Sequence, residues 1–178
     1  SIRETFPQAR VIRMDLDTVR RKRAHDRIID AFNRKKYDIL LGTQMVAKGH
    51  DFDKVTLVGV ISADTTLLLP DFRATERTFQ LLTQVAGRAG RRDQQGEVVI
   101  QTYYPEHFGI ECARTHNYMK FYASEIIKRS ELGYPPYTRL IQMLIKGENE
   151  PRVIMHIKAL AQELRQGIEA IDILGPVP

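Results

Sequence analysis

Short runs of aliphatic residues recur along the first hundred residues of the chain. The four runs cover residues 11–14, 37–41, 55–61 and 97–102. Aliphatic runs of this length are typical of parallel strands that are covered on both faces. Parallel neighbours need long crossover connections, and these are usually helices that pack on the sheet. The sequence therefore predicts the α/β class, with a parallel sheet flanked by helices.

The segments between these runs carry apolar residues at helical spacing, preceded by residues that favour helix starts. Asp17 or Thr18 is the expected cap of the first helix, and Asp71 is the expected cap of the second. Pro105 opens a third helical stretch, which breaks near Asn117. The predicted helices cover residues 19–36, 72–89 and 105–132.

The sequence Gly133-Tyr134-Pro135-Pro136 is the clearest boundary in the chain, because glycine and proline interrupt regular structure. Beyond it, the pattern predicts a strand over residues 139–145, a helix over 151–166 and a strand over 171–174. A unit of about 40 residues is too small to bury a core alone, so we expect the truncated beginning of a small α+β domain. The expected domains are residues 1–133 and residues 134–178.

Positive charge is concentrated at one end of the sequence. The whole chain holds 27 Lys and Arg against 22 Asp and Glu, a net charge of +5. The first 36 residues alone hold 11 basic and 5 acidic side chains, so the remainder is close to neutral. A clustered cationic surface attracts nucleic acid by releasing its counterions. The densest run, Arg20-Arg21-Lys22-Arg23, is a predicted DNA contact, with a solvated helix face as the alternative interpretation.

Composition excludes several classes of protein. No apolar run approaches the roughly 18–20 residues that cross a bilayer, so no membrane partner is expected. Cys112 is the only cysteine, which excludes an internal disulfide framework and fits a reducing, cytoplasmic location. Cys112 and His116 have no second pair of ligands nearby, so we expect a buried thiol and no metal site.

Six aromatic residues follow the strand predicted over residues 97–102. Exposed rings can stack on the bases of single-stranded DNA. Rings at helical spacing more often pack against other helices, and packing is the prediction here. The six are Tyr103, Tyr104, Phe108, Tyr118, Phe121 and Tyr122.

A polar loop follows the second predicted strand directly. It reads Gly42-Thr43-Gln44-Met45-Val46-Ala47-Lys48-Gly49-His50-Asp51-Phe52. In an open parallel sheet, ligands bind at the carboxyl ends of the strands. Glycine permits close backbone approach, and Thr43, Gln44 and Lys48 offer donors to phosphate oxygens. Asp51 can accept a hydrogen bond from a partner arginine or from a ribose hydroxyl.

A second polar segment, Gln84-Val85-Ala86-Gly87-Arg88-Ala89-Gly90-Arg91, ends a predicted helix. Arg88 and Arg91 are three residues apart and share a helical face. The neighbouring glycines let another surface come close to both guanidinium groups. Arginines presented in this way can stabilise charge on a transferring γ-phosphate. A helix end whose cations complement the macrodipole is the alternative.

The sequence lacks two features that nucleotide hydrolysis requires. It contains no G-x-x-x-x-G-K-[ST] phosphate loop and no adjacent acidic pair of the Asp-Glu type to hold magnesium. The chain alone is therefore expected to be inactive and to need a second lobe that supplies both.

These segments resemble helicase motifs. Residues 43–52 resemble motif V, and residues 84–91 resemble motif VI, of superfamily 2 helicases. Residues 13–18, 69–77 and 133–137 are similar to phrases of the bacterial replication-restart helicases. The resemblance implies a RecA-like C-terminal helicase lobe followed by part of a further domain. The enzyme implied is ATP-dependent, moves 3′ to 5′ on DNA, recognises stalled replication forks and initiates primosome assembly.

The resemblance also implies roles for particular residues. The implied catalytic residues are Arg88, Arg91 and Gln84. The implied nucleotide-binding residues are Lys48, Gly49, Asp51, Arg88 and Arg91. The implied DNA-binding residues are Thr43 and Gln44, together with the run Arg20–Arg23.

The implied cofactor is ATP with magnesium, held mainly by the first lobe, which this sequence lacks. Zinc is implied for the full-length family but not for this part of it. The implied partners are single-stranded and forked DNA, primosome proteins and single-strand-binding protein. Two other classes stay open: a nucleic-acid-binding module without motor activity, and a doubly wound enzyme that uses residues 42–52 for a small phosphorylated ligand.

Overall fold

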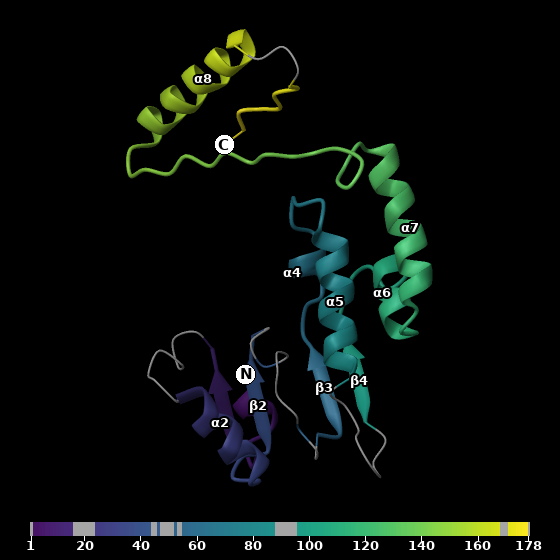
Figure 1. Cartoon of the computed structure of the whole chain (residues 1–178). Helices are drawn as coiled ribbons and strands as arrows, with labels where there is room; N and C mark the ends of the chain where they lie inside the picture. The colour runs from purple at the N-terminus through teal and green to yellow at the C-terminus, as the bar shows by residue number, and fades with distance from the viewer. Residues whose placement is uncertain are drawn as a thin grey trace. The chain divides into compact units, whose positions relative to one another are not determined.

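The computed structural model describes residues 2–15, 24–43, 46, 52, 55–87, 96–167 and 171–177. The chain divides into two compact units, Ser1–Tyr137 and Thr138–Pro178 (Figure 1). The first unit begins with the short helix α1 (Ile2–Thr5) and continues with parallel strands and helices in alternation. This arrangement confirms the predicted α/β class. The domain boundary expected between residues 133 and 134 stays a prediction.

The first parallel pair of strands encloses a small core with one helix. Its elements are β1 (Val11–Met14), α2 (Ala24–Asn33) and β2 (Ile39–Gly42). Met14 at the end of β1 lies opposite Gly42 at the end of β2. Ile29 of α2 is buried with Met14 and Phe52, and Phe32 meets the Phe52 ring edge to face at 5.6 Å between centroids. The first helix, predicted over residues 19–36, is described from Ala24 and ends at Asn33, three residues earlier than predicted. Its expected caps, Asp17 and Thr18, lie outside the described residues.

The second parallel pair lies further along the first unit. Its elements are β3 (Leu57–Val60), α4 (Asp64–Leu67), α5 (Ala74–Ala86) and β4 (Glu97–Ile100). Leu57 lies opposite Glu97, and Val60 lies opposite Ile100. A single parallel sheet was predicted, whereas the described strands form two separate pairs, β1–β2 and β3–β4. Aliphatic runs indicate strands and their parallel direction, but they do not encode which strands are neighbours.

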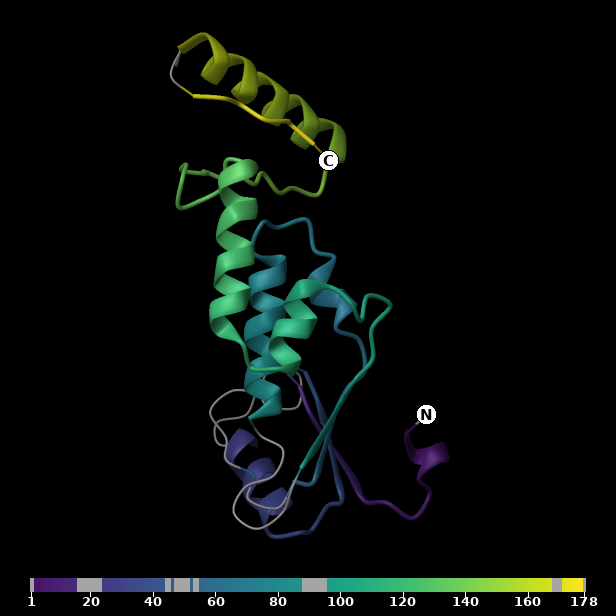
Figure 2. The same ribbon diagram turned by 90° about the vertical axis from the view of Figure 1, so that its right-hand side faces the viewer.

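Two further helices, α6 (Phe108–Arg114) and α7 (Tyr118–Glu131), follow β4. The chain breaks between them at Asn117, as predicted, because Asn117 Oδ1 accepts a hydrogen bond from the Lys120 amide at 2.9 Å. Helices α5, α6 and α7 pack side by side, and α6 contacts both of the others (Figures 1 and 2).

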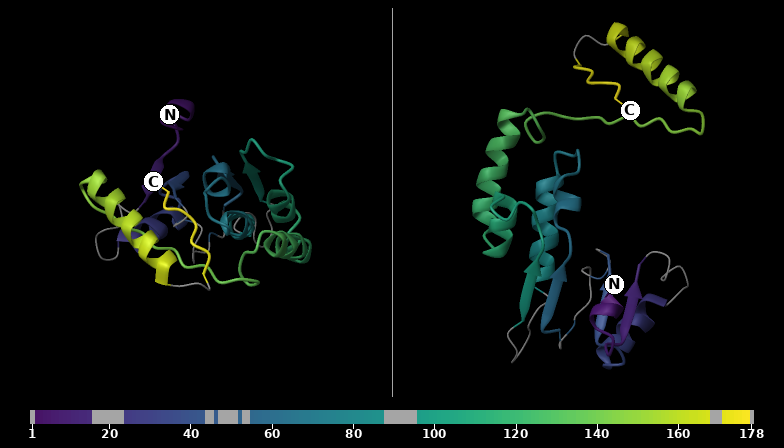
Figure 3. Two further views of the ribbon diagram at one scale, coloured as in Figure 1. Left: turned by 90° about the horizontal axis from the view of Figure 1, so that it is seen from above. Right: turned by 180° about the vertical axis from the view of Figure 1, so that it is seen from behind.

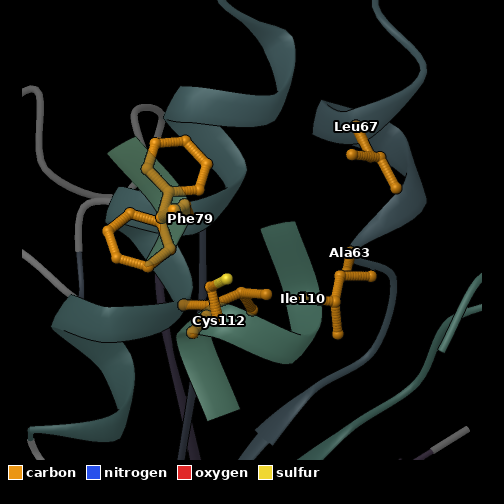
Figure 4. Close-up of a cluster of buried hydrophobic side chains, with 8 residues drawn as sticks. Ala63, Leu67, Phe79, Ile110 and Cys112 are labelled. Carbon is orange, nitrogen blue, oxygen red and sulfur yellow. The ribbon is translucent and has the colours of Figure 1, made fainter. Parts of the chain in front are cut away.

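The larger core of the first unit lies among these three helices and α4 (Figure 4). Phe79 of α5 and Phe121 of α7 stack with their ring centroids 4.1 Å apart. Cys112 of α6 is 1% exposed, which confirms the expected buried thiol. The buried members are Ala63, Leu67, Phe79, Leu82, Ile110, Cys112, Ala113 and Phe121.

The second unit contains the helix α8 (Glu150–Gly167), which confirms the helix predicted over residues 151–166. Figure 3 shows the stretch after α8 running back beside it, where Arg165 Nη2 donates to the carbonyl of Gly175 at 2.5 Å. The prediction of strands over residues 139–145 and 171–174 is wrong. Both segments lack a strand partner in the described part of the chain, and a strand needs hydrogen bonds from a neighbour that its own sequence cannot supply.

No helix within the described ranges combines the length and the apolar character that are needed to span a membrane.

Candidate functional site

The polar loop after β2 begins at a close contact between two strands. A Cβ atom on Gly42 would lie 2.5 Å from the carbonyl oxygen of Met14, so this position requires glycine. Thr43 follows with its side chain exposed, and its carbonyl accepts a hydrogen bond from the Val46 amide at 3.0 Å. Val46 and Phe52 pack in the small core, and so they hold two points of the loop against the strands.

Gly42→Ala is expected to lower the free energy of unfolding by about 1–3 kcal/mol, because the added methyl group overlaps the Met14 carbonyl. Gly59→Ala is the matched control, since Gly59 also lies in a parallel strand and nothing lies within 4 Å of a Cβ atom there. The control should be neutral or slightly stabilised. Urea unfolding of the two variants measures the difference, and equal stabilities would contradict the close contact.

Asp64, the first residue of α4, joins the carboxyl ends of β3 and β4. Its carboxylate accepts hydrogen bonds from the Thr102 hydroxyl at 2.6 Å and from the Tyr103 amide at 3.1 Å. Asp64 is only 9% exposed, so water competes weakly for these bonds. Asp64 was not among the predicted site residues, although it lies just after a strand, where ligands bind in parallel sheets.

Gln84 lies in the last turn of α5, where it is half-buried and lines a groove between α5 and α7. The helix ends at Ala86, three residues earlier than predicted. Gly87 closes it with helical backbone angles and donates its amide to the carbonyl of Thr83 at 3.1 Å. The second polar segment therefore begins on a helix that is packed in the larger core.

The other end of α5 is organised by Asp71, in a way that differs from the prediction. Asp71 Oδ1 accepts a hydrogen bond from the Arg73 amide at 2.9 Å, and the carboxylate pairs with the guanidinium groups of Arg73 and Arg77. The hydrogen bonds from Arg73 lower the pKa of Asp71 to about 2. The helix begins at Ala74 with Arg73 in the cap position, so Asp71 is not the cap: its carboxylate is held in the preceding turn.

Arg129 of α7 links three parts of the first unit. Its guanidinium contacts Glu76 of α5 at 2.8 Å and Glu125 of α7 at 2.9 Å, and it donates to the carbonyl of Pro135 at 3.2 Å. Only 14% of its side chain is exposed, so solvent screens these ion pairs weakly. Arg129 and Glu76 are 53 residues apart in sequence, a separation that no local pattern could indicate.

Most of the predicted site residues lie outside the described residues. These are Arg88, Arg91, Gln44, Lys48, Gly49, Asp51 and the run Arg20–Arg23. Thr43 and Gln84 are described, and they lie on different elements, one at the end of β2 and one on α5. Within the described ranges, no group of three or more His, Cys, Asp or Glu side chains comes together as a metal site requires.

The described parallel strands and the helices between them are those of a RecA-like lobe. Residues 3–93, which include both polar segments, match the family model for the helicase conserved C-terminal domain. This match covers just over half of the chain. The chain therefore belongs to the helicase conserved C-terminal domain family, as its resemblance to superfamily 2 helicases indicated.

More specific similarity extends over the whole chain. Residues 130–178 match the family model for the primosomal protein N C-terminal domain. Replication restart protein PriA of Bacillus subtilis is 52% identical over 174 residues, which are 97% of this chain and 22% of that protein. The PriA of Synechocystis is 48% identical over 100% of this chain and 22% of its own length. The PriA of Haemophilus influenzae is 39% identical over 100% and 24%. The chain thus spans about a fifth of the length of these relatives.

Proposed function

We propose that this chain is the second motor lobe of an ATP-dependent DNA helicase that acts in replication restart. The enzyme moves 3′ to 5′ on single-stranded DNA, recognises stalled forks and starts primosome assembly with single-strand-binding protein among its partners. The similarity to replication restart proteins over the whole chain supports this role. ATP and magnesium are held mainly by the other lobe, and zinc belongs to another part of the enzyme.

One observation carries the proposal: the second polar segment starts on α5, with Gln84 on its last turn, and the chain leaves the helix at Gly87, one residue before Arg88. A helix fixed in the core of one lobe is a rigid base for arginines that reach a nucleotide on another lobe. In this role Arg88 and Arg91 stabilise the charge that develops on the γ-phosphate. Thr43 and Gln44 contact DNA, while Lys48, Gly49 and Asp51 connect the DNA to the nucleotide.

A chimera tests this proposal. In the Bacillus subtilis relative, the region that matches this chain is replaced by the chain itself, an exchange that the 52% identity makes conservative. We expect the chimera to hydrolyse ATP and to do so faster when single-stranded DNA is added. Deletion of the region should abolish hydrolysis. A folded chimera that binds ATP without hydrolysing it, beside an active parent, would contradict the proposal.

The same measurement separates the motor from the alternative, a nucleic-acid-binding module. The module would keep salt-sensitive DNA binding through the basic run Arg20–Arg23 and would contribute nothing to ATP hydrolysis. The motor lobe, by contrast, both binds DNA and contributes to ATP hydrolysis.

A further inference from the structure

An open aromatic groove of about 740 Å³ lies between α5 and α7 of the first unit. The stacked rings of Phe79 and Phe121 line its base, and both residues are buried. Tyr118 and Tyr122, on successive turns of α7, line its side and are 60% and 49% exposed. Packing was predicted for the six aromatic residues between residues 103 and 122. Phe108 and Phe121 pack in the core as predicted, whereas the four tyrosines are exposed, although the Tyr118 ring also contacts Phe79 at 6.3 Å between centroids. A spacing of four residues places two rings on one helix face, but it does not say what covers that face.

The charge at one end of this α5–α7 groove is unbalanced. Glu76 and Glu125 both line the groove, and both contact the single guanidinium of Arg129. Arg73, which also attracts Glu76, is paired with Asp71 and does not line the groove. Two carboxylates therefore share one lining cation, and the Glu125 side chain is only 12% exposed. Such an end attracts a further cation and repels phosphate.

A buried hydroxyl group in the groove has no hydrogen-bond partner among the described residues. It is Thr83 Oγ1, on the face of α5 that lines the groove. On the same helix, the hydroxyl of Thr78 donates to the carbonyl of Ala74 at 2.9 Å, as helical threonines commonly do. Buried polar atoms without partners are rare, and they often mark a place where a ligand supplies the missing group. Gln80 and Gln84 also line the groove, and the side-chain amide of Gln80 donates to Glu76 Oε1 at 3.1 Å.

We propose that the α5–α7 groove binds a segment of a partner polypeptide that carries a Lys or Arg side chain and a large apolar side chain. The apolar group packs on the tyrosines above Phe79 and Phe121. The cation joins the Glu76 and Glu125 end, and a backbone amide of the segment donates to the Thr83 hydroxyl once the side chains that cover it have moved aside. Glu76 and Thr83 are seven positions apart, about 10 Å along α5. The segment therefore spans about two helical turns or three extended residues.

Peptide selection tests the proposal directly. Random 12-residue peptides displayed on phage are first passed over the Tyr122→Ala variant, and the phage that bind it are discarded. The remaining phage are then selected for binding to the unmodified 178-residue chain. We expect the selected peptides to combine Lys or Arg with an aromatic or aliphatic residue. In fluorescence anisotropy, the affinity of a labelled peptide should fall at least about tenfold in Tyr122→Ala, because a central aromatic contact is lost. Tyr104→Ala is the matched control, since Tyr104 is also 49% exposed but lies outside the groove lining.

Glu125→Gln tests the charge requirement and should weaken binding of the same peptide by a similar factor, while circular dichroism shows an unchanged fold. Should Glu125→Gln fail to fold, Tyr118→Ala provides the second groove variant, because Tyr118 is exposed. The proposal would be overturned if no selected peptide lost affinity in Tyr122→Ala, or if the selected peptides were rich in Asp and Glu. Binding of labelled dT12, or self-association, that is lost in Tyr122→Ala would also overturn it and assign the groove to DNA or to a second copy.

Discussion

ATP turnover is expected to fall by about 10³-fold or more when Arg88 or Arg91 is replaced by Ala in the Bacillus chimera. Each guanidinium is proposed to meet negative charge that is larger in the transition state than in the bound nucleotide. Its loss therefore lowers kcat, while nucleotide binding by the other lobe persists. Lysine at either position keeps the charge but loses the planar, bidentate geometry, so it should restore little of the rate.

Steady-state kinetics of the DNA-stimulated reaction measure this effect. Arg114→Ala is the control, because Arg114 is an exposed arginine in the last turn of α6, outside both polar segments. That variant should keep the kcat of the unmodified chimera. A kcat within about twofold of the unmodified value in both Arg88→Ala and Arg91→Ala would remove the catalytic role assigned to them.

Phe121→Ala is expected to lower the free energy of unfolding by about 3–5 kcal/mol. Phe121 is 4% exposed, stacks on Phe79 and faces the Phe108 ring at 5.9 Å between centroids. Removal of the ring leaves a cavity among α5, α6 and α7, because three packed helices cannot close fully around an alanine. The loss is a large share of the stability of an ordinary domain.

Urea unfolding followed by far-UV circular dichroism measures this loss. Tyr103→Ala is the control, since Tyr103 is 88% exposed. The control should stay within about 0.5 kcal/mol of the unmodified chain. If Phe121→Ala is as stable as Tyr103→Ala, the helices do not enclose this ring as described.

The strands and helices of the first unit could be predicted because their signals are local. Aliphatic runs indicate buried strands, and the break at Asn117 follows from the ability of its side chain to cap a helix. Neighbour relations are not local. The division of the strands into two pairs and the ion pair between Arg129 and Glu76 both depend on the tertiary fold.

Exposure is the property that sequence periodicity predicts least well. Tyr118, Phe121 and Tyr122 share a helical pattern, yet Phe121 is buried and the two tyrosines are exposed. The pattern gives the face on which a ring lies, and only the neighbouring helix decides whether that face is covered. The apolar segment 139–145 shows the same dependence, because it is extended without a strand partner in the described part of the second unit.

The candidate site could be predicted in part. Gly42 and Thr43 follow from the rule that ligands bind at the carboxyl ends of parallel strands, and Gln84 follows from the motif that it begins. The bond between Asp64 and Thr102 could not be derived, because it needs two strand ends to be adjacent in space. The catalytic role of Arg88 and Arg91 stays a prediction that rests on the motif.

A structure of the chimera with ADP, aluminium fluoride and magnesium tests the central claim most directly, because this complex mimics the γ-phosphate during transfer. The proposal predicts that the guanidinium groups of Arg88 and Arg91 both lie within hydrogen-bond distance of the fluoride ligands, across the gap from the lobe that holds the nucleotide. Finding both groups instead in ion pairs with carboxylates of their own lobe, turned away from the nucleotide, would contradict it.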